Sequence, residues 1–250
     1  MDEDQIRPLW MRGGLPRSYL AASDRASYRW RDSYIGTFLE RDIPQLGINI
    51  PAPTLRRFWA MLSHYHGQIM NFAEFARSFG VSDMTVRKYI DILEGTFMVR
   101  VLQSWHNNTR KRLVKSPKIY LRDSGLFHSL QSIDSMEQLL AHNRLGPSWE
   151  GFAVEQACQA IDKDGRDIYF WRTHAGAEVD LFWQAGGKSW AIECKFADAP
   201  KSTRSMQSAL VDLELEHLWV VYPGKEKYRI AERITALPLN GIMEKLYVIP

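Results

Sequence analysis

The 250-residue sequence contains only two cysteines, Cys158 and Cys194. Two cysteines provide neither a disulfide framework nor the spacing of a zinc finger, and they fit the reducing environment of the cytoplasm. The chain also lacks an apolar run of about 18 residues that could span a bilayer, and its acidic N-terminus, broken by Pro8, does not resemble a secretion signal. We therefore predict a cytoplasmic protein that does not insert into a membrane.

Strong charge of one sign is also lacking. The formal net charge is +3, with 45% hydrophobic and 24% charged residues, which is typical of a soluble globular chain with one large or two modest domains. So small an excess permits a polyanionic partner without requiring one, and only local clustering of the cations would be informative. No internal repeat or low-complexity tract is visible, so the organisation has to be inferred from periodicity and turn residues.

Residues 1–50 predict a helical segment. Gly13 and Gly14 indicate a turn. The following stretch, "YRWRDSYIGTFLERDI", carries its larger side chains at helical spacing, and Pro44 is expected to end this helix. The opening is abrupt for a domain.

Residues 51–125 predict a winged helix. Thr54 is expected to cap a first helix from Leu55 to about Tyr65. In "MNFAEFARSFGVSDMTVRKYIDILEG", Gly80 marks a tight turn between two further helices, and Ser82 can cap the second of them. Two strands, "FMVRVLQSW" and "KSPKIYLRD", then flank a basic loop.

This basic loop gives the predicted winged helix two interpretations. The loop holds Arg110, Lys111, Arg112 and Lys115 with no acidic residue, and Arg87 and Lys88 lie on the second helix of the turn. In one interpretation these cations contact the phosphate backbone of DNA, because clustered cations gain affinity by releasing condensed counterions. In the other, the hairpin is a solvated loop on a module that docks against a neighbouring domain.

Residues 145–250 predict a small mixed sheet flanked by helices. A helix through "GPSWEGFAVEQACQAID" precedes three strands, "DIYFWRT", "AEVDLFWQ" and "SWAIECK", and a second helix then leads to a fourth strand, "HLWVVYP". The order is αβββαβ, and the crossover to the last strand is expected to be right-handed. The tryptophans Trp171, Trp183 and Trp190 are expected in the core, since alternation places them with apolar neighbours.

The segment "AGGKS" in the middle of this sheet resembles the end of a phosphate-binding loop. A true loop needs a glycine where Phe182 stands, and it must lead into a helix rather than into the strand-like "WAIECK". The segment is better interpreted as a hairpin turn in which glycine supplies positive φ.

The flanks of that turn carry the candidate chemistry. Glu193 and Lys195 share one face of their strand, and Asp180 can lie opposite or diagonal to them, because the hairpin brings the two strands within about 5 Å. Asp180 and Glu193 are oxygen ligands of the kind Mg²⁺ prefers, Lys195 could orient a bound water, and Glu155 on the preceding helix is a further candidate carboxylate. The alternative is an ion-pair cluster on a half-exposed strand.

These residues resemble a known superfamily. "EVD" followed by "IECK", in αβββαβ order, resembles the PD-(D/E)XK nuclease superfamily, which has the restriction-endonuclease-like fold. The resemblance implies that Asp180, Glu193 and Lys195 correspond to its metal-binding and catalytic positions. Many members of that superfamily have lost activity.

The wider chain is similar to a narrower group. "RGGLPRSYL", "TFLERDI", "SPKIYLRDSGL", "WEGFAVEQ" and "FWRTHAGAEVDL" resemble the C-terminal region of prokaryotic AAA-type ATPases that carry the domain of unknown function 4143. In such proteins an ATP-binding domain precedes "RGGLP". The resemblance implies that this chain is a fragment or a truncated homologue and that ATP enters only through the missing domain, because no Walker A sequence is present.

The predicted fold class is therefore α+β, a helical N-terminal segment and winged helix followed by a restriction-endonuclease-like αβββαβ domain. The expected function is that of a nucleic-acid-associated region of an AAA-type ATPase with a Mg²⁺-dependent nuclease site. The expected partners are DNA and an ATPase domain of the same or another chain, and self-association is left open. The alternatives are a non-catalytic module that binds DNA or docks on a protein, and a purely structural scaffold.

Overall fold

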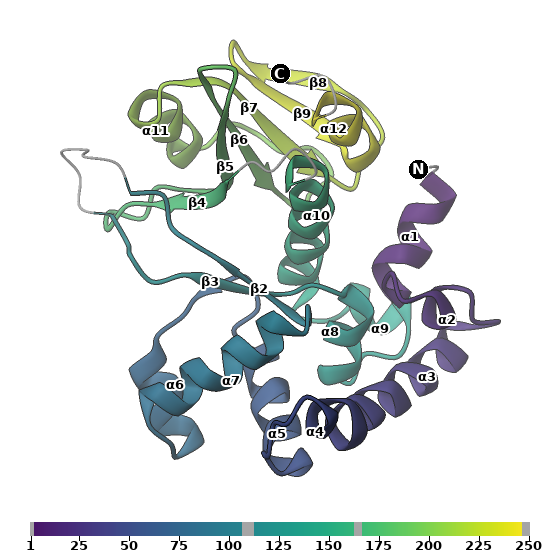
Figure 1. The fold of residues 1–250 in the computed structure, drawn as a ribbon. Helices are drawn as coiled ribbons and strands as arrows, with labels where there is room; N and C mark the ends of the chain where they lie inside the picture. Colours follow the sequence, from purple (N-terminus) through teal and green to yellow (C-terminus); the bar gives the residue numbers. More distant parts are fainter. Residues whose placement is uncertain (1–2, 107–112, 163–166, 247–250) are drawn as a thin grey trace. The chain divides into compact units, whose positions relative to one another are not determined.

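The computed structural model describes residues 3–106, 113–162 and 167–246 (Figure 1). It confirms the α+β class, with helices in the N-terminal part and a mixed sheet in the C-terminal part. The chain divides into two compact units. Unit 1 comprises residues 1–101 and 119–151, and unit 2 comprises residues 102–118 and 152–250. Within the described ranges, no helix has the length and apolar character needed to cross a membrane.

Unit 1 is mainly helical. Its elements are α1 (Glu3–Arg12), α2 (Pro16–Tyr19), α3 (Asp24–Thr37), the π-helical turn η1 (Phe38–Asp42), α4 (Ile43–Gln45), α5 (Ala52–Ser63), β1 (Gln68–Ile69), α6 (Phe72–Phe79), α7 (Asp83–Gly95), β2 (Val99–Leu102), β3 (Lys118–Leu121), α8 (Ser124–Leu130) and α9 (Met136–Leu140). The last residue of β2 and the first of β3 are assigned to unit 2. The three strands form a small sheet in the order β1-β3-β2.

The predicted two-helix corner is present in unit 1. Gly80 ends α6 in the left-handed conformation with φ of 79°, which glycine adopts without steric cost. Ser82 caps α7 by accepting a hydrogen bond from the Thr85 amide. Phe58 of α5 packs edge-to-face on Phe75 of α6, with ring centroids 5.1 Å apart, so the corner is held on a shared aromatic core.

Of two predicted helix boundaries in unit 1, one is confirmed to within a residue and one is wrong. The predicted long helix runs through α3, η1 and α4 and ends at Gln45, one residue after Pro44. Thr54 does not cap α5, which begins at Ala52 after Pro51 and contains Thr54 in its first turn. Pro53 also lies in the first turn of α5, where the fixed φ of proline suits the beginning of a helix.

Unit 2 contains one six-stranded sheet with helices beside it (Figure 1). The elements after α10 (Leu145–Asp162), which runs from unit 1 into unit 2, are β4 (Ile168–Arg172), β5 (Glu178–Ala185), β6 (Lys188–Cys194), α11 (Arg204–Asp212), β7 (Leu215–Tyr222), β8 (Tyr228–Ala231), β9 (Ile234–Pro238) and α12 (Leu239–Leu246). The strand order is β4-β5-β6-β7-β9-β8. The elements α10 to β7 thus follow the predicted order, and β8 and β9 are additional strands that the sequence analysis did not identify.

The pairing in this sheet is mixed. Strands β4, β5 and β6 are antiparallel, and β6 pairs in parallel with β7 after the α11 connection. One face packs on α11 through residues that alternate along the strands, such as Phe182, Ala191 and Leu218 with Met206. The other face carries α12, which packs on β7 and β9. Each central strand therefore presents alternate side chains to two different environments.

Candidate carboxylate site

The β5–β6 hairpin positions the two predicted carboxylates. Gly186 and Gly187 form its two-residue turn with φ of 58° and 70°, the positive values that glycine was expected to supply. The register pairs Phe182 with Ala191 and Leu181 with Ile192. The next positions along the same register are Asp180 and Glu193, whose side chains share the α11 face of the sheet. The segment "GGKS" is a turn, as predicted, and it sets the register that brings the carboxylates together.

Both oxygens of Asp180 have hydrogen-bond donors. The Cys194 amide donates to Oδ2 at 2.8 Å, and the Lys118 ammonium donates to Oδ1 at 3.1 Å. The residue is only 5% exposed. A buried carboxylate is expensive unless it is paired, and these two donors hold Asp180 in place.

Lys118 belongs to this cluster, although no sequence pattern predicted a role for it. Its side chain is 3% exposed, and its Nζ lies 2.5 Å from Glu178 Oε1 in addition to its contact with Asp180. Glu178 is shared in turn with Arg172, whose Nη1 lies 2.7 Å from Oε2. The only sequence signal for Lys118 is a lysine at the head of the apolar strand "KIYL", 62 positions before Asp180.

Glu193 is the least satisfied group of the cluster. Its Oε1 lies 2.6 Å from the Lys195 ammonium, but its buried Oε2 has no hydrogen-bond partner. Burial, followed by the nearby charge of Asp180, raises the pKa of Glu193 to about 8, although Lys195 and Lys118 act in the opposite direction. At neutral pH this carboxyl group therefore retains a proton for much of the time.

The raised pKa of Glu193 gives a pH dependence of stability in metal-free buffer. The ordinary value for this carboxyl group is 4.5 and the folded value about 8, so the folded state binds more protons between these two values. The stabilising effect of that proton is complete below pH 4.5 and is lost as the pH rises through 8. We expect the free energy of unfolding of the wild type, relative to Glu193→Gln, to fall from pH 5 to pH 8 and to level off above pH 8.

Urea denaturation in the presence of a chelator measures this difference. The glutamine side chain of the variant resembles the protonated carboxyl group and does not titrate, so the two proteins should agree best at the acidic end of the range. Parallel stability curves for the two proteins across the range would show that Glu193 does not titrate as described.

Among the described residues, Glu155 does not join Asp180 and Glu193 as a third ligand of one metal ion. Glu155 is buried on α10, where its Oε1 accepts a hydrogen bond from Gln159 Nε2 at 3.1 Å. In the part of the chain that the structure describes, no three side chains of the His, Cys, Asp and Glu types gather as ligands for one metal ion. The candidate ligand set is therefore the pair Asp180 and Glu193, without Glu155.

The pair fits Mg²⁺ as an ion that takes one or two carboxylates and keeps several waters. Glu193 Oε2 is a buried acceptor without a donor, and it is available once the carboxyl group loses its proton. Lys118 Nζ lies farther from Asp180 Oδ1, at 3.1 Å, than from Glu178 Oε1, at 2.5 Å. Lys118 can therefore keep Glu178 as its partner while Asp180 Oδ1 turns to a cation.

The structure describes only some of the residues that were predicted to contact DNA. Arg110, Lys111 and Arg112 lie outside the described residues. Lys115 and Lys88 are exposed, and the Arg87 guanidinium lies 3.7 Å from the Phe72 ring centroid, an arrangement that fixes its position on α7. Arg87 and Lys88 both lie in unit 1, and Lys115 lies in unit 2.

These observations define an α+β chain in which two buried carboxylates of the mixed sheet pair with the buried Lys118 and the partly exposed Lys195. The family described as "Domain of unknown function (DUF8612)" matches residues 3–137, more than half of the chain, and the chain belongs to this family. The family described as "Domain of unknown function (DUF4143)" matches residues 145–242. The resemblance to the domain of unknown function 4143 is thus confirmed for the sheet-containing part, while the residues before it match a different family.

Two mycobacterial proteins are similar to nearly the whole chain. They are "Uncharacterized protein Rv2008c" of Mycobacterium tuberculosis (strain ATCC 25618 / H37Rv) and "Uncharacterized protein Mb2031c" of Mycobacterium bovis (strain ATCC BAA-935 / AF2122/97). Each is 47% identical over 235 residues, which cover 94% of this chain and 53% of the relative. The chain therefore spans about half the length of these relatives. No solved structure matches it.

Proposed function

We propose that this chain is the nucleic-acid-associated C-terminal region of an AAA-type ATPase, with a Mg²⁺-dependent nuclease site at Asp180, Glu193 and Lys195. One observation carries the nuclease part of the proposal. Two buried carboxylates and a lysine meet at the end of one hairpin, and one carboxylate keeps an oxygen without a donor. Such a set is costly to bury, and strongly shifted carboxyl groups concentrate at functional sites.

The order of the elements supports a restriction-endonuclease-like interpretation of unit 2. The helix α10, the antiparallel strands β4, β5 and β6, the crossover α11 and the parallel strand β7 follow the αβββαβ order of that fold. The ATPase part of the proposal rests on the resemblance of the quoted motifs and on relatives about twice as long as the match. The helices α6 and α7, with the strands that follow them, are interpreted as the winged helix.

Each group of the site has a distinct role in this proposal. Asp180 and Glu193 hold the ion, which when bound supplies charge neutralisation at the phosphorus and a more acidic water. Lys195 is 43% exposed at its side chain, so its ammonium can reach a substrate phosphate while it remains near Glu193. Lys118 stays buried and holds Glu178 and Asp180 in position.

Incubation of supercoiled plasmid and of single-stranded DNA with the protein tests the proposal. We expect both substrates, or one of them, to be cut in Mg²⁺ or Mn²⁺ and to remain intact with chelator. Intact DNA under all these conditions, with a properly folded protein, would contradict the nuclease assignment.

The Lys118 contact favours a second candidate function, a non-catalytic DNA-binding module. If the Lys118 ammonium permanently occupies the place of a metal ion, the cluster is only an ion-pair network, and the chain binds DNA without cutting it. The exposed cation Lys88 and the stacked Arg87 on α7 would then carry the function.

DNA binding has a measurable salt signature in either case. Each lost phosphate contact reduces the slope of log K against log salt by about one. We expect Arg87→Ala and Lys88→Ala each to weaken binding to duplexes of unrelated sequence and to lower this slope, while the exposed Lys201→Ala leaves it unchanged. Fluorescence anisotropy over a range of salt concentrations measures the slopes, and identical values for all four proteins would remove α7 from the interface.

A further inference from the structure

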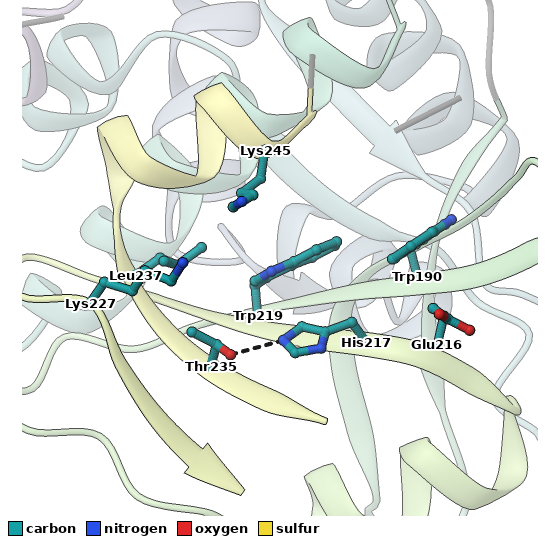
Figure 2. A pocket seen from close by; sticks show the side chains of 8 residues that line it. All are labelled: Trp190, Glu216, His217, Trp219, Lys227, Thr235, Leu237 and Lys245. Atoms are coloured by element: carbon teal, nitrogen blue, oxygen red, sulfur yellow. Dashed lines mark hydrogen bonds between the residues drawn. The ribbon is translucent and has the colours of Figure 1, made fainter. Parts of the chain in front are cut away.

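Unit 2 holds a concave site that is distinct from the carboxylate cluster (Figure 2). It is a cavity of about 300 Å³ beside β6, β7, β9 and α12. Trp190 lines it, and because side chains alternate along β6, Trp190 lies on the opposite face of the sheet from Glu193. Trp190 also lies near the start of β6, whereas Glu193 lies near its end. The two sites are therefore separated by the sheet itself.

The floor of this cavity is aromatic. The rings of Trp190 and Trp219 stack with centroids 5.4 Å apart and planes 10° apart, and Trp219 also stacks on the buried Trp183 at 6.1 Å. Trp190 Nε1 donates to the Ala185 carbonyl at 3.2 Å, which fixes the orientation of its ring. Trp190 was expected in the core but is only half-buried, because it lines the open cavity. The result is a rigid, partly open stack.

The rim of the cavity is cationic. Lys245 projects from α12 over Trp219, and Lys227 lies on the neighbouring side of the cavity (Figure 2). Both lysines are exposed. Glu216, the one carboxylate among the described lining residues, is engaged by Lys188 at 2.8 Å. The electrostatic potential at the rim of the cavity is therefore positive.

His217 gives an independent sign of this positive field. Its Nε2 lies 3.0 Å from Thr235 Oγ1, on the wall of the cavity. Burial lowers the pKa of His217, Glu216 opposes this, and the charges of Lys227, Arg229 and Lys245 lower it further. Three cations thus act on one point in the cavity wall.

We propose that this cavity binds a nucleotide, with the base against the Trp190 and Trp219 stack and the phosphate at Lys227 and Lys245. A flat indole surface accepts any base through its π-face, and ammonium groups recognise a phosphate as point charges. A volume of about 300 Å³ lies at the lower end of the range for small-molecule sites, which suits one nucleotide unit and excludes a duplex. The ligand is either a free nucleoside monophosphate or the terminal unit of a single strand.

This inference does not require the carboxylate site to be catalytic. The two sites use different residues on different faces, so Glu193→Gln should leave nucleotide binding unchanged. A failure of DNA cleavage and a failure of nucleotide binding are therefore separable results.

Isothermal titration calorimetry with four probes tests the inference on the full chain. The probes are adenosine 5′-monophosphate, adenosine, inorganic phosphate and a 5′-phosphorylated deoxythymidine tetramer. We expect adenosine 5′-monophosphate to bind at least tenfold more tightly than adenosine or phosphate, because only it uses both the stack and the lysines. Tighter binding of the tetramer than of the monophosphate would identify a strand end as the ligand, and the reverse order a free nucleotide.

Variants separate the two halves of the site. The double change Lys227→Ala with Lys245→Ala should weaken binding of the monophosphate at least tenfold and leave binding of adenosine unchanged. Trp190→Leu should weaken binding of both ligands. Lys201→Ala, an exposed lysine outside the cavity, is the matched control. Equal affinity for phosphate and for the monophosphate, or an unchanged monophosphate affinity in the double variant, would overturn the proposal, as would the absence of binding by every probe.

Discussion

Glu193→Gln is expected to lower the rate of Mg²⁺-dependent DNA cleavage by about 10²–10³-fold, the scale on which removal of one charge-stabilising group acts. Glutamine keeps the volume and the neutral form that Glu193 already favours near pH 7, so the fold should tolerate the change. What it removes is the anionic state in which the unpartnered Oε2 can bind the ion. The loss should therefore lie in metal-dependent chemistry rather than in stability.

Glu232→Gln is the control for the cleavage experiment, since it makes the same chemical change at an exposed position of unit 2. Gel assays of initial rates at several Mg²⁺ concentrations measure the effect. If cutting by Glu193→Gln equals that of the wild type and of Glu232→Gln, the activity arises elsewhere or from a contaminant, and Glu193 is not a ligand.

Lys118→Met is expected to lower the free energy of unfolding by about 3–5 kcal/mol in metal-free buffer, the typical cost of removing one partner of a buried ion pair. The ammonium is 3% exposed and contacts Glu178 and Asp180, and its loss leaves Asp180 with only the Cys194 amide as a donor. Glu178 keeps Arg172, so the effect arises mainly at Asp180. Urea denaturation of the purified protein measures the change.

Lys188→Met is the matched control for this experiment. It removes the same charge from an exposed pair with Glu216, which should contribute less than about 1 kcal/mol. Mn²⁺ should stabilise Lys118→Met more than it stabilises the wild type, because the ion then replaces the missing positive charge at Asp180. Equal costs for the two variants, with no additional effect of Mn²⁺, would show that Lys118 is not the internal cation of this cluster.

The core of the carboxylate site could be predicted because it depends on local rules. The period of two along a strand places Glu193 and Lys195 on one face, and a two-residue glycine turn fixes which residue of the partner strand lies opposite Glu193. Both rules operate within the span from Asp180 to Lys195, so no knowledge of distant contacts was required.

The positions of Lys118 and Glu155 could not be predicted, because the local sequence does not determine them. Lys118 reaches Asp180 from a strand 62 positions earlier, and no periodicity links two such segments. Glu155 lies on α10, which is buried on most sides, so the helical pattern gives no single inward face from which its direction could be inferred. Pairing between distant strands and burial of a whole helix are set by tertiary packing.

Tertiary packing is also the reason why the additional strands and the partial exposure of Trp190 could not be predicted. The short strands β8 and β9 are only four and five residues long, and their place in the sheet follows from the pairing of β9 with β7 and of β8 with β9. Alternation correctly gave the face on which Trp190 lies. It could not show that α12 and β9 leave a cavity over that face.

A titration with Mn²⁺ tests most directly whether Asp180 and Glu193 hold a divalent cation. Electron paramagnetic resonance of free Mn²⁺ counts bound ions for the wild type, Glu193→Gln and the control Glu232→Gln at pH 8.5, where the Glu193 proton is largely lost. We predict one site in the wild type and the control, with affinity at least tenfold lower in Glu193→Gln, since loss of a supporting group at a metal site costs about 10–100-fold or more. The same weak binding by all three proteins would contradict the account and leave the cluster as an ion-pair network.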